Sequence, residues 1–277
     1  MLAGLLVALV LVYFFAHHFS AIDMAKAVAL ATVAIGFGGS MTYGQTLGLT
    51  QDTPLLGNFA ALRWGLTGTF IKGSIWIGFF GLFLGLGLGG KKYSLIEILL
   101  ILFVSIFFLY LGIYILNEPF NPANKKLPFL YFSDDWYWEP DNNLKPRREQ
   151  WGGLFFALLF LFSYISIVKK DILARNMTLW GLLAGGFGFT LGQCVQAYHA
   201  WNTNEIKNGI LSNIYPYINW WNMMEITFGA IFAFIIALGL WYNKHHISPK
   251  KNNASFQLDA KAELGLLAVH IVALLTW

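Results

Sequence analysis

The chain is organised as long apolar runs separated by short polar connections. A helix needs about 20 mainly apolar residues to cross the hydrocarbon core of a bilayer, and the runs lack the alternation that is typical of strands. They predict seven complete membrane-spanning helices and the start of an eighth, at about residues 2–16, 24–44, 66–89, 94–116, 152–168, 177–198, 220–242 and 262–277. All eight prolines lie outside these runs, as expected where a freed backbone carbonyl would meet lipid.

The composition excludes a water-soluble globule. Of 277 residues, 57% are hydrophobic and 12% are charged, against about 45–50% and about 25% in soluble domains. The 25 Phe, 12 Tyr and 11 Trp exclude disorder, and the single Cys194 excludes a disulfide framework. We therefore predict an all-α fold, a polytopic transmembrane helical bundle in which residues 1–277 form one integral membrane domain.

The two ends of the chain call for separate interpretations. The first run starts at Met1 without a basic segment and ends without a small-residue cleavage site, so we interpret it as an anchor and not as a signal peptide. The last run stops at Trp277 after 16 residues. It indicates either a fragment or a short terminal helix.

Lysine and arginine predict how the bundle faces, because they resist translocation. They gather in alternate connections, at Lys26, Lys91, Lys92, Lys169, Lys170, Arg175, Lys244, Lys250 and Lys251. We place these connections on the cytoplasmic side of a plasma or inner membrane. The N-terminus and the connections 45–65, 117–151 and 199–219 then lie outside. The formal charge of +4 has this explanation and indicates no nucleic acid partner.

The connection 117–151 is long and aromatic. Its acidic and basic side chains nearly cancel, and it contains seven Phe, Tyr and Trp residues between Phe120 and Trp138. Because disorder disfavours aromatic residues, we predict an ordered extracytoplasmic cap loop. Its most distinctive side chains are the pair Asp134 and Asp135 and the pair Arg147 and Arg148. They suit a ligand, and equally they suit one another as ion pairs inside the cap.

Polar and aromatic side chains gather at the outer ends of the predicted spans. Gln193, Gln196 and His199 recur every three residues, so on a helix they form a polar stripe that would not face lipid. Tryptophan beside amides suits a sugar-like ligand, although interfacial anchoring explains any one of them. We predict an outward-facing pocket with the ligand-binding residues Gln45, Arg63, Asp134, Asp135, Arg147, Arg148, Gln193, Asn222, Trp201 and Trp221.

Two ionisable residues fall within predicted spans. Glu225 lies five residues inside the seventh span and is a functional candidate by default, or else a carboxyl that fixes helix packing, for example with Asn222. Lys72 lies on the third span, where snorkelling, pairing with Glu225 or ligand binding would each explain it. We expect Glu225 to couple protonation to any binding cycle.

Three classes of function remain open. The first is binding, and possible transport, of a polar solute, either sugar-like or anionic. The second is a membrane-embedded transferase or hydrolase acting on a lipid-linked or cell-envelope substrate at the outer leaflet, with Glu225 or His199 as the catalytic base and an arginine holding a phosphate. The third is an assembly subunit that docks a partner protein.

Two apparent sites, a phosphate-binding loop and a zinc site, lack features that their function requires. Gly85 to Lys91 matches the start of a phosphate loop, but Lys92 replaces the serine or threonine and no strand precedes it. A zinc site would need His199, Glu225 and Asp134 or Asp135 to converge, and we predict no metal site. The sequence names no cofactor. The partners that it predicts are the lipid bilayer and a small polar or lipid-linked ligand.

Overall fold

The computed structural model describes residues 2–41, 43–119, 133–134, 150–249 and 268. This part of the chain is helical apart from one parallel pair of two-residue strands, β1 (Glu118–Pro119) and β2 (Ser133–Asp134). The α-helices are α1 (Leu2–Ala16), α2 (Ala21–Gly38), α3 (Gly44–Gln51), α4 (Phe59–Leu88), α5 (Leu95–Leu116), α6 (Trp151–Ser163), α7 (Ile172–Trp201), α8 (Thr203–Asn208) and α9 (Trp220–Tyr242). A π-helix, η4 (Tyr164–Val168), extends α6.

Five described segments are long and apolar enough to cross a membrane, where the sequence predicted seven or eight. They are Ala21–Gly38, Phe59–Leu88, Ile96–Leu116, Trp151–Val168 and Trp220–Tyr242. Leu2–Ala16 is apolar but shorter, and α7 is long but is diluted by glycine, threonine and glutamine. The predicted span 262–277 and most of the predicted cap lie outside the described residues. The five helices are those of an integral membrane protein.

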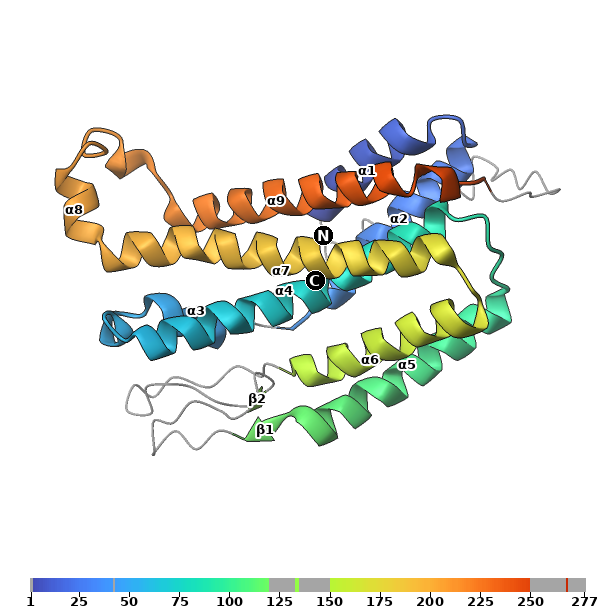
Figure 1. Ribbon diagram of the computed structural model, residues 1–277, viewed down its shortest axis with the longest axis horizontal. Helices are drawn as coiled ribbons and strands as arrows, with labels where there is room; N and C mark the ends of the chain where they lie inside the picture. The colour runs from blue at the N-terminus through green and yellow to red at the C-terminus, as the bar shows by residue number, and fades with distance from the viewer. Residues whose placement is uncertain (1, 42, 120–132, 135–149, 250–267, 269–277) are drawn as a thin grey trace.

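The centre of the bundle is the contact between α4 and α7, which run antiparallel side by side (Figure 1). Their backbones touch at glycines: a β-carbon on Gly185 would overlap the carbonyl oxygen of Gly73, and one on Gly73 would overlap that of Gly185. About two helical turns further along α4, a β-carbon on Gly81 would likewise overlap the carbonyl oxygen of Met177. In lipid, such close approach replaces the hydrophobic effect as the source of helix association.

A second partner runs antiparallel along α4, and it is interrupted. A β-carbon on Gly87 of α4 would overlap Ala27 of α2, and one on Gly65 of α4 would overlap the side chain of Thr50 of α3. Helices α2 and α3 therefore pack one after the other along α4, with a break between them. The sequence placed the glycine-rich segment from Gly39 at the outer end of a span, whereas the structure places it opposite the middle of α4.

Side chains of α4 and α7 surround the break between α2 and α3. The Trp76 indole Nε1 donates to the carbonyl oxygen of Ile35 at 2.8 Å, which also accepts the backbone N–H of the C-cap residue Gly39. Tyr43 stacks on Trp76 and packs edge-on against Phe189. Lys72, which is 1% exposed, donates to the Thr46 hydroxyl. Irregular backbone at this depth is tolerated because it is buried in protein.

Helices α5 and α6 form a hairpin on one side of the bundle (Figure 1). They too meet at glycines, since a β-carbon on Gly112 would overlap the carbonyl oxygen of Gly152. The outer face of α5 is apolar and exposed, with Phe103 and Tyr110 at 72% and 67%. A helix with such a face suits contact with lipid.

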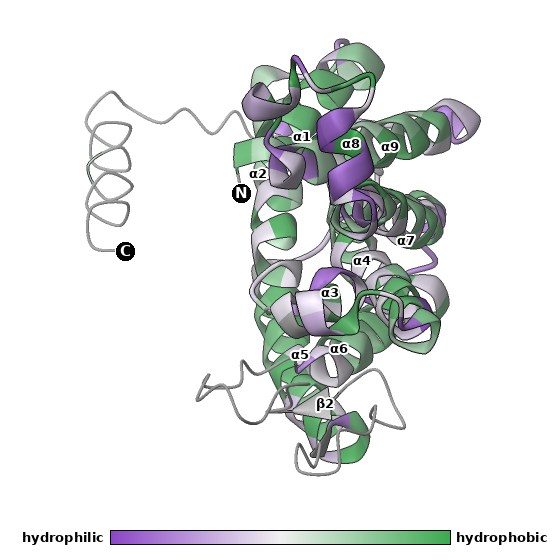
Figure 2. Cartoon of the chain, turned by 90° about the vertical axis from the view of Figure 1, so that its left-hand side faces the viewer, coloured by the Kyte–Doolittle hydropathy of each residue, from purple (hydrophilic) through white to green (hydrophobic). Residues whose placement is uncertain are grey.

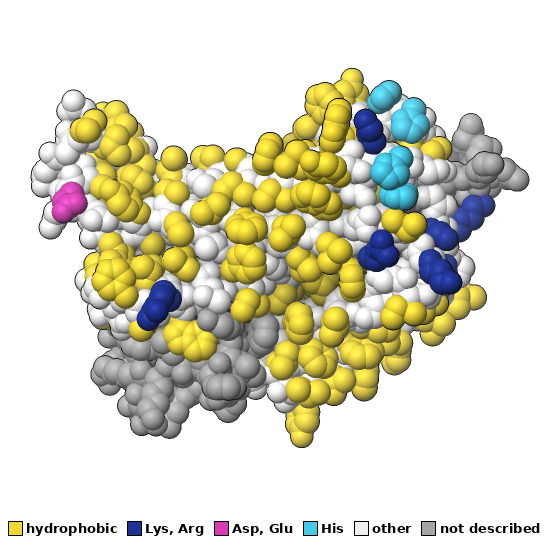
Figure 3. Space-filling model, in the orientation of Figure 1, with side chains coloured by type: hydrophobic (Ala, Val, Ile, Leu, Met, Phe, Trp, Pro, Cys, Tyr) yellow, Lys and Arg dark blue, Asp and Glu magenta, His cyan; other side chains and the backbone are white. Residues whose placement is uncertain are grey.

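The two ends of the bundle differ in charge. Lysine and arginine side chains gather at the end that holds the α6–α7 turn, and hydrophobic side chains cover the middle of the same face (Figure 3). The opposite end, seen in Figure 2, holds α3, the hydrophilic α8 and the start of α9. The predicted separation of the connections into two groups is therefore present at opposite ends of the described bundle.

The α4–α7 contact yields a stability prediction. Gly185→Ala should lower the free energy of unfolding by about 2–3 kcal/mol, because the new methyl group forces two backbones apart. Gly229→Ala on α9 is the matched control, since nothing lies within 4 Å of its β-carbon position. It should be neutral or stabilising by up to about 1 kcal/mol. Thermal unfolding in detergent measures both, and equal melting temperatures would contradict the account.

Candidate functional site

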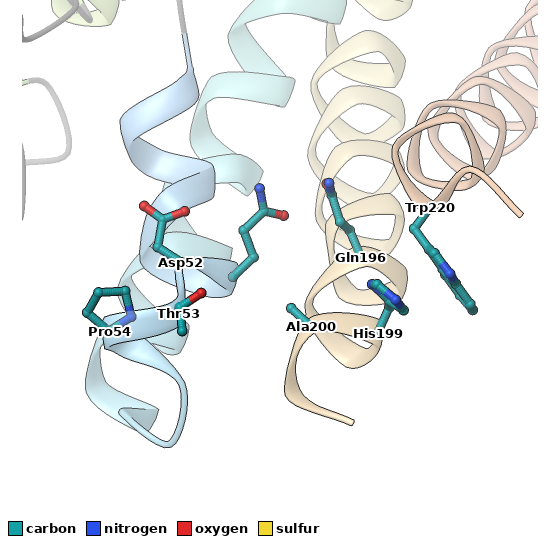
Figure 4. A pocket seen from close by; sticks show the side chains of 8 residues that line it. Asp52, Thr53, Pro54, Gln196, His199, Ala200 and Trp220 are labelled. Atoms are coloured by element: carbon teal, nitrogen blue, oxygen red, sulfur yellow. The ribbon is translucent and has the colours of Figure 1, made fainter. Parts of the chain in front are cut away.

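A pocket of about 480 Å³ opens at the end of the bundle that holds α3 and α8. The residues that line it come from three places, the turn after α3, the last turns of α7 and the start of α9: Gln51, Asp52, Thr53, Pro54, Gln196, His199, Ala200 and Trp220. Figure 4 shows Thr53 on one side of this pocket, facing Gln196, Ala200 and His199 on α7. We call it the end pocket.

A buried hydrogen-bond network fixes α3 against α7 beneath the end pocket. Gln193, which is fully buried, donates through Nε2 to the Thr50 hydroxyl at 2.6 Å and to Oε1 of Gln51 at 3.2 Å. The Trp201 indole donates to the carbonyl oxygen of Thr50 at 2.9 Å. Because these bonds hold the C-terminal end of α3, they position the turn that forms one side of the pocket.

His199 is held between two aromatic rings. Its Nε2 lies 3.0 Å from the hydroxyl of Tyr215, and its ring stacks on Trp220 with the centroids 4.4 Å apart. Partial burial, assisted by the charge of Lys207, lowers the pKa of His199 below its usual value. The imidazole is therefore neutral at pH 7, and it can accept or donate a hydrogen bond according to its tautomer.

Two polar atoms of the end pocket are buried and have no hydrogen-bond partner among the described residues. They are the amide oxygen Oε1 of Gln196 and the indole nitrogen Nε1 of Trp220. A buried polar group without a partner costs about 1–3 kcal/mol. The residues that line the pocket thus hold one unused acceptor and one unused donor, both just beneath the cavity surface.

The polar lining does not continue through the bundle. Below Gln193, the Lys72 ammonium reaches Thr46 near the start of α3. Beyond it lie the packed rings of Trp76 and Phe228, with centroids 5.6 Å apart, and then the apolar core around Phe232. Among the described residues, the polar contacts beneath the end pocket therefore give way to a layer of packed aromatic and apolar side chains.

Some of the sequence-predicted site residues, the catalytic candidate His199 and the ligand candidates Gln193 and Trp201, lie around the pocket. His199 lines it, Gln193 lies directly beneath it, and Trp201 bonds to the backbone of α3 at its base. The structure brings these three side chains together, although Gln193 and Trp201 bond to α3 while His199 lines the cavity. Only His199 of the three faces the cavity.

Other predicted residues lie on exposed surfaces away from the pocket lining. The Trp221 indole donates to Oε1 of Glu225 at 2.8 Å, one turn further along α9, and both side chains are exposed. Asn222 is exposed, and its backbone N–H donates to the N-cap Asn219. Arg63 is exposed on α4. Glu225 thus accepts a hydrogen bond from Trp221, while the Lys72 ammonium donates to Thr46.

The remaining predicted residues cannot be placed in the site. Asp135, Arg147 and Arg148 lie outside the described residues. Asp134 pairs through its backbone with Pro119 in the β1–β2 bridge. Gln45 lies in the first turn of α3. Among the residues that the structure describes, no group of three or more His, Cys, Asp or Glu side chains could hold a metal ion.

Two parts of the pocket were missed by sequence reasoning. Residues 51–54 were placed in the outer connection 45–65 but were not singled out, and Trp221 was chosen instead of its neighbour Trp220. A signal for Trp220 exists: it is followed at intervals of four by Met224, Phe228, Phe232 and Ile236, the face of α9 that packs inward. Trp221, one residue later, does not belong to this inward-packing series on α9.

Comparison with known proteins gives no relative. No family model, no curated protein and no solved structure matches the chain. The interpretation of the end pocket therefore rests on its own geometry.

The lowered pKa of His199 predicts a pH dependence of stability. As the pH falls below about 6.5, the unfolded chain takes up a proton that the folded chain resists, so the free energy of unfolding decreases. The melting temperature in detergent should fall between pH 7.5 and pH 5, and less steeply in His199→Gln. Identical pH profiles for the two proteins would contradict the burial of a neutral imidazole.

Proposed function

We propose that the chain is an integral membrane protein that binds a small, neutral, hydroxyl-rich solute in the end pocket. The observation that carries this proposal is the pair of buried, unpartnered groups, Gln196 Oε1 and Trp220 Nε1. A ligand toward which these two side chains turn, so that it satisfies both groups, would recover the free energy that their burial costs. Cavities of this size are typical of small-molecule sites.

The chemistry of the two groups selects the ligand class. The amide oxygen of Gln196 can only accept a hydrogen bond, and the Trp220 indole can only donate one. An anion such as a carboxylate would supply only acceptors, and an ammonium would supply only donors. A hydroxyl group does both, so a ligand with adjacent hydroxyls satisfies the pocket with one kind of group.

The charge of the lining supports a neutral ligand. The eight residues of the end pocket include the carboxylate Asp52 and no lysine or arginine. The neutral state of His199 adds no positive charge. Of the two solute classes that the sequence left open, the sugar-like one is favoured over the anionic one.

Movement of the solute across the membrane would be a further step. The packed rings of Trp76 and Phe228 close the bundle beneath the end pocket. Transport would require this aromatic layer to separate while the end pocket closes, as in alternating access. The proposal therefore concerns binding first, and transport only as its extension.

An enzyme is the second candidate, because Asp52 and His199 line the same pocket. A neutral imidazole can act as a general base on a hydroxyl that the pocket holds. The two candidates differ at His199: His199→Gln should retain solute binding in either case, but it should abolish turnover if the protein is a hydrolase or transferase. Glu225 is exposed and lies outside the pocket lining.

Solute binding is tested with purified protein and a panel of monosaccharides and polyols, with intrinsic fluorescence and melting temperature as readouts. For any panel member that binds, Trp220→Phe should weaken affinity about tenfold, because it keeps the ring and removes the donor. Gln196→Leu should have a similar effect. Trp221→Phe is the matched control, since that indole bonds to Glu225 outside the pocket.

Two outcomes would contradict the proposal. One is a panel in which no sugar or polyol shifts the melting temperature. The other is a bound solute whose affinity is unchanged by both Trp220→Phe and Gln196→Leu.

A further inference from the structure

The basic end of the bundle holds two cavities that share one turn. A cavity of about 430 Å³ is lined by Lys91, Lys170 and His246, together with the Gly89–Gly90 turn. A neighbouring cavity of about 400 Å³ is lined by Lys170 and Arg175. Lys170 lies between them, and the side chains of Lys91, Lys170 and Arg175 are exposed.

The backbone at Lys170 is held in a sparsely populated conformation. Its φ of 49° lies in the left-handed region, the only such non-glycine residue among those described. The π-helix η4 ends two residues earlier. Strained backbone and π-helical turns both concentrate at functional positions, and here they set Lys170 at the boundary of the two cavities.

The next residue, Asp171, fixes this turn. Its carboxylate is 2% exposed, accepts from the Tyr93 hydroxyl at 2.9 Å and caps α7 through the Ala174 N–H at 3.1 Å. Its backbone N–H donates to the carbonyl of Ile165. Asp171 is therefore committed to structure. The two cavities contain three cationic side chains against this one carboxylate.

Lys169, by contrast, is not available for a ligand. Its ammonium forms an ion pair with Glu97 at 2.7 Å, donates to the carbonyl of Lys92 and lies over the Tyr93 ring. The cations that face the cavities are thus separate from the cation that joins α5 to α6. Arg175 donates through Nε to the Asn176 side chain, and among the described residues no carboxylate lies within ion-pair distance of Lys91, Lys170 or Arg175.

An apolar groove lies on the other side of the Tyr93–Asp171 hydrogen bond. It is formed between α2, α4, α5 and α6, and its lining includes Leu30, Leu86, Leu102 and Ile165 as well as Tyr93. Tyr93 therefore belongs to the groove, while its bonding partner Asp171 belongs to both basic cavities. A basic surface and an apolar groove meet at one residue pair.

We infer that this end of the bundle binds an anionic phospholipid, with the phosphate against Lys91, Lys170 and Arg175 and an acyl chain in the apolar groove. Charge complementarity selects the anionic headgroup, since each lysine or arginine near a membrane surface attracts acidic lipid. The adjoining groove favours a lipid over a free anion, because only a lipid has an acyl chain that gains free energy by contact with apolar surface. This site is independent of the end pocket, which lies at the opposite end.

The test uses the full chain purified in detergent, titrated with dilauroyl phosphatidylglycerol and analysed by native mass spectrometry. Dilauroyl phosphatidylcholine and inorganic phosphate form parallel arms. The test variant is Lys91→Gln with Lys170→Gly, which removes two charges and relieves the strained backbone, because glycine adopts positive φ freely. The control is Arg63→Gln with Lys207→Gln, two charges from the opposite end.

Phosphatidylglycerol should bind at least tenfold more tightly than phosphatidylcholine. The test variant should lose about 25-fold in phosphatidylglycerol affinity, at about fivefold per charge, and should melt no lower than the parent. The control variant should bind as the parent does. Equal affinity for the two lipids, or an unaffected test variant, would overturn the inference, and displacement of the lipid by millimolar inorganic phosphate would identify a free-anion site instead.

Discussion

The structure depends on the direct contact between the backbones of α4 and α7. Gly73 and Gly185 leave no room for a side chain between these two helices, and every other part of the described bundle is arranged around the pair. Helices α2 and α3 follow α4, and α9 follows α7. Within lipid, where burial of apolar surface gives little gain, van der Waals packing at small residues is what holds helices together.

This constraint explains how polar chemistry comes to lie at one end. Since α2 and α3 pack one after the other along α4, the C-terminal end of α3 reaches the last turns of α7. There Gln193 and Trp201 bond to Thr50 and bring the turn after α3 opposite His199. On either side of the break, Trp76 and Lys72 of α4 bond to Ile35 of α2 and Thr46 of α3. The pocket is therefore a consequence of the break between α2 and α3.

Hydropathy predicted the helical class and most helix positions, because an uncharged run of sufficient length has few alternatives to a helix in lipid. It did not distinguish a helix end from a helix break: the segment from Gly39 to Tyr43 has the glycine and polar content of either. It also could not rank residues around a helix that is apolar on all sides. Trp220 and Trp221 are equivalent in composition, and only the inward phase of α9 separates them.

The most direct measurement of the account is proximity across the end pocket, by cross-linking in native membranes in a Cys194→Ser background. Thr53→Cys and Ala200→Cys should be joined by a short bifunctional thiol reagent, since both positions line the same cavity. Thr53→Cys paired with Lys170→Cys, at the opposite end, should not be joined. Failure of the first pair to cross-link, or equal cross-linking of both pairs, would contradict the arrangement of α3 against α7 on which the pocket depends.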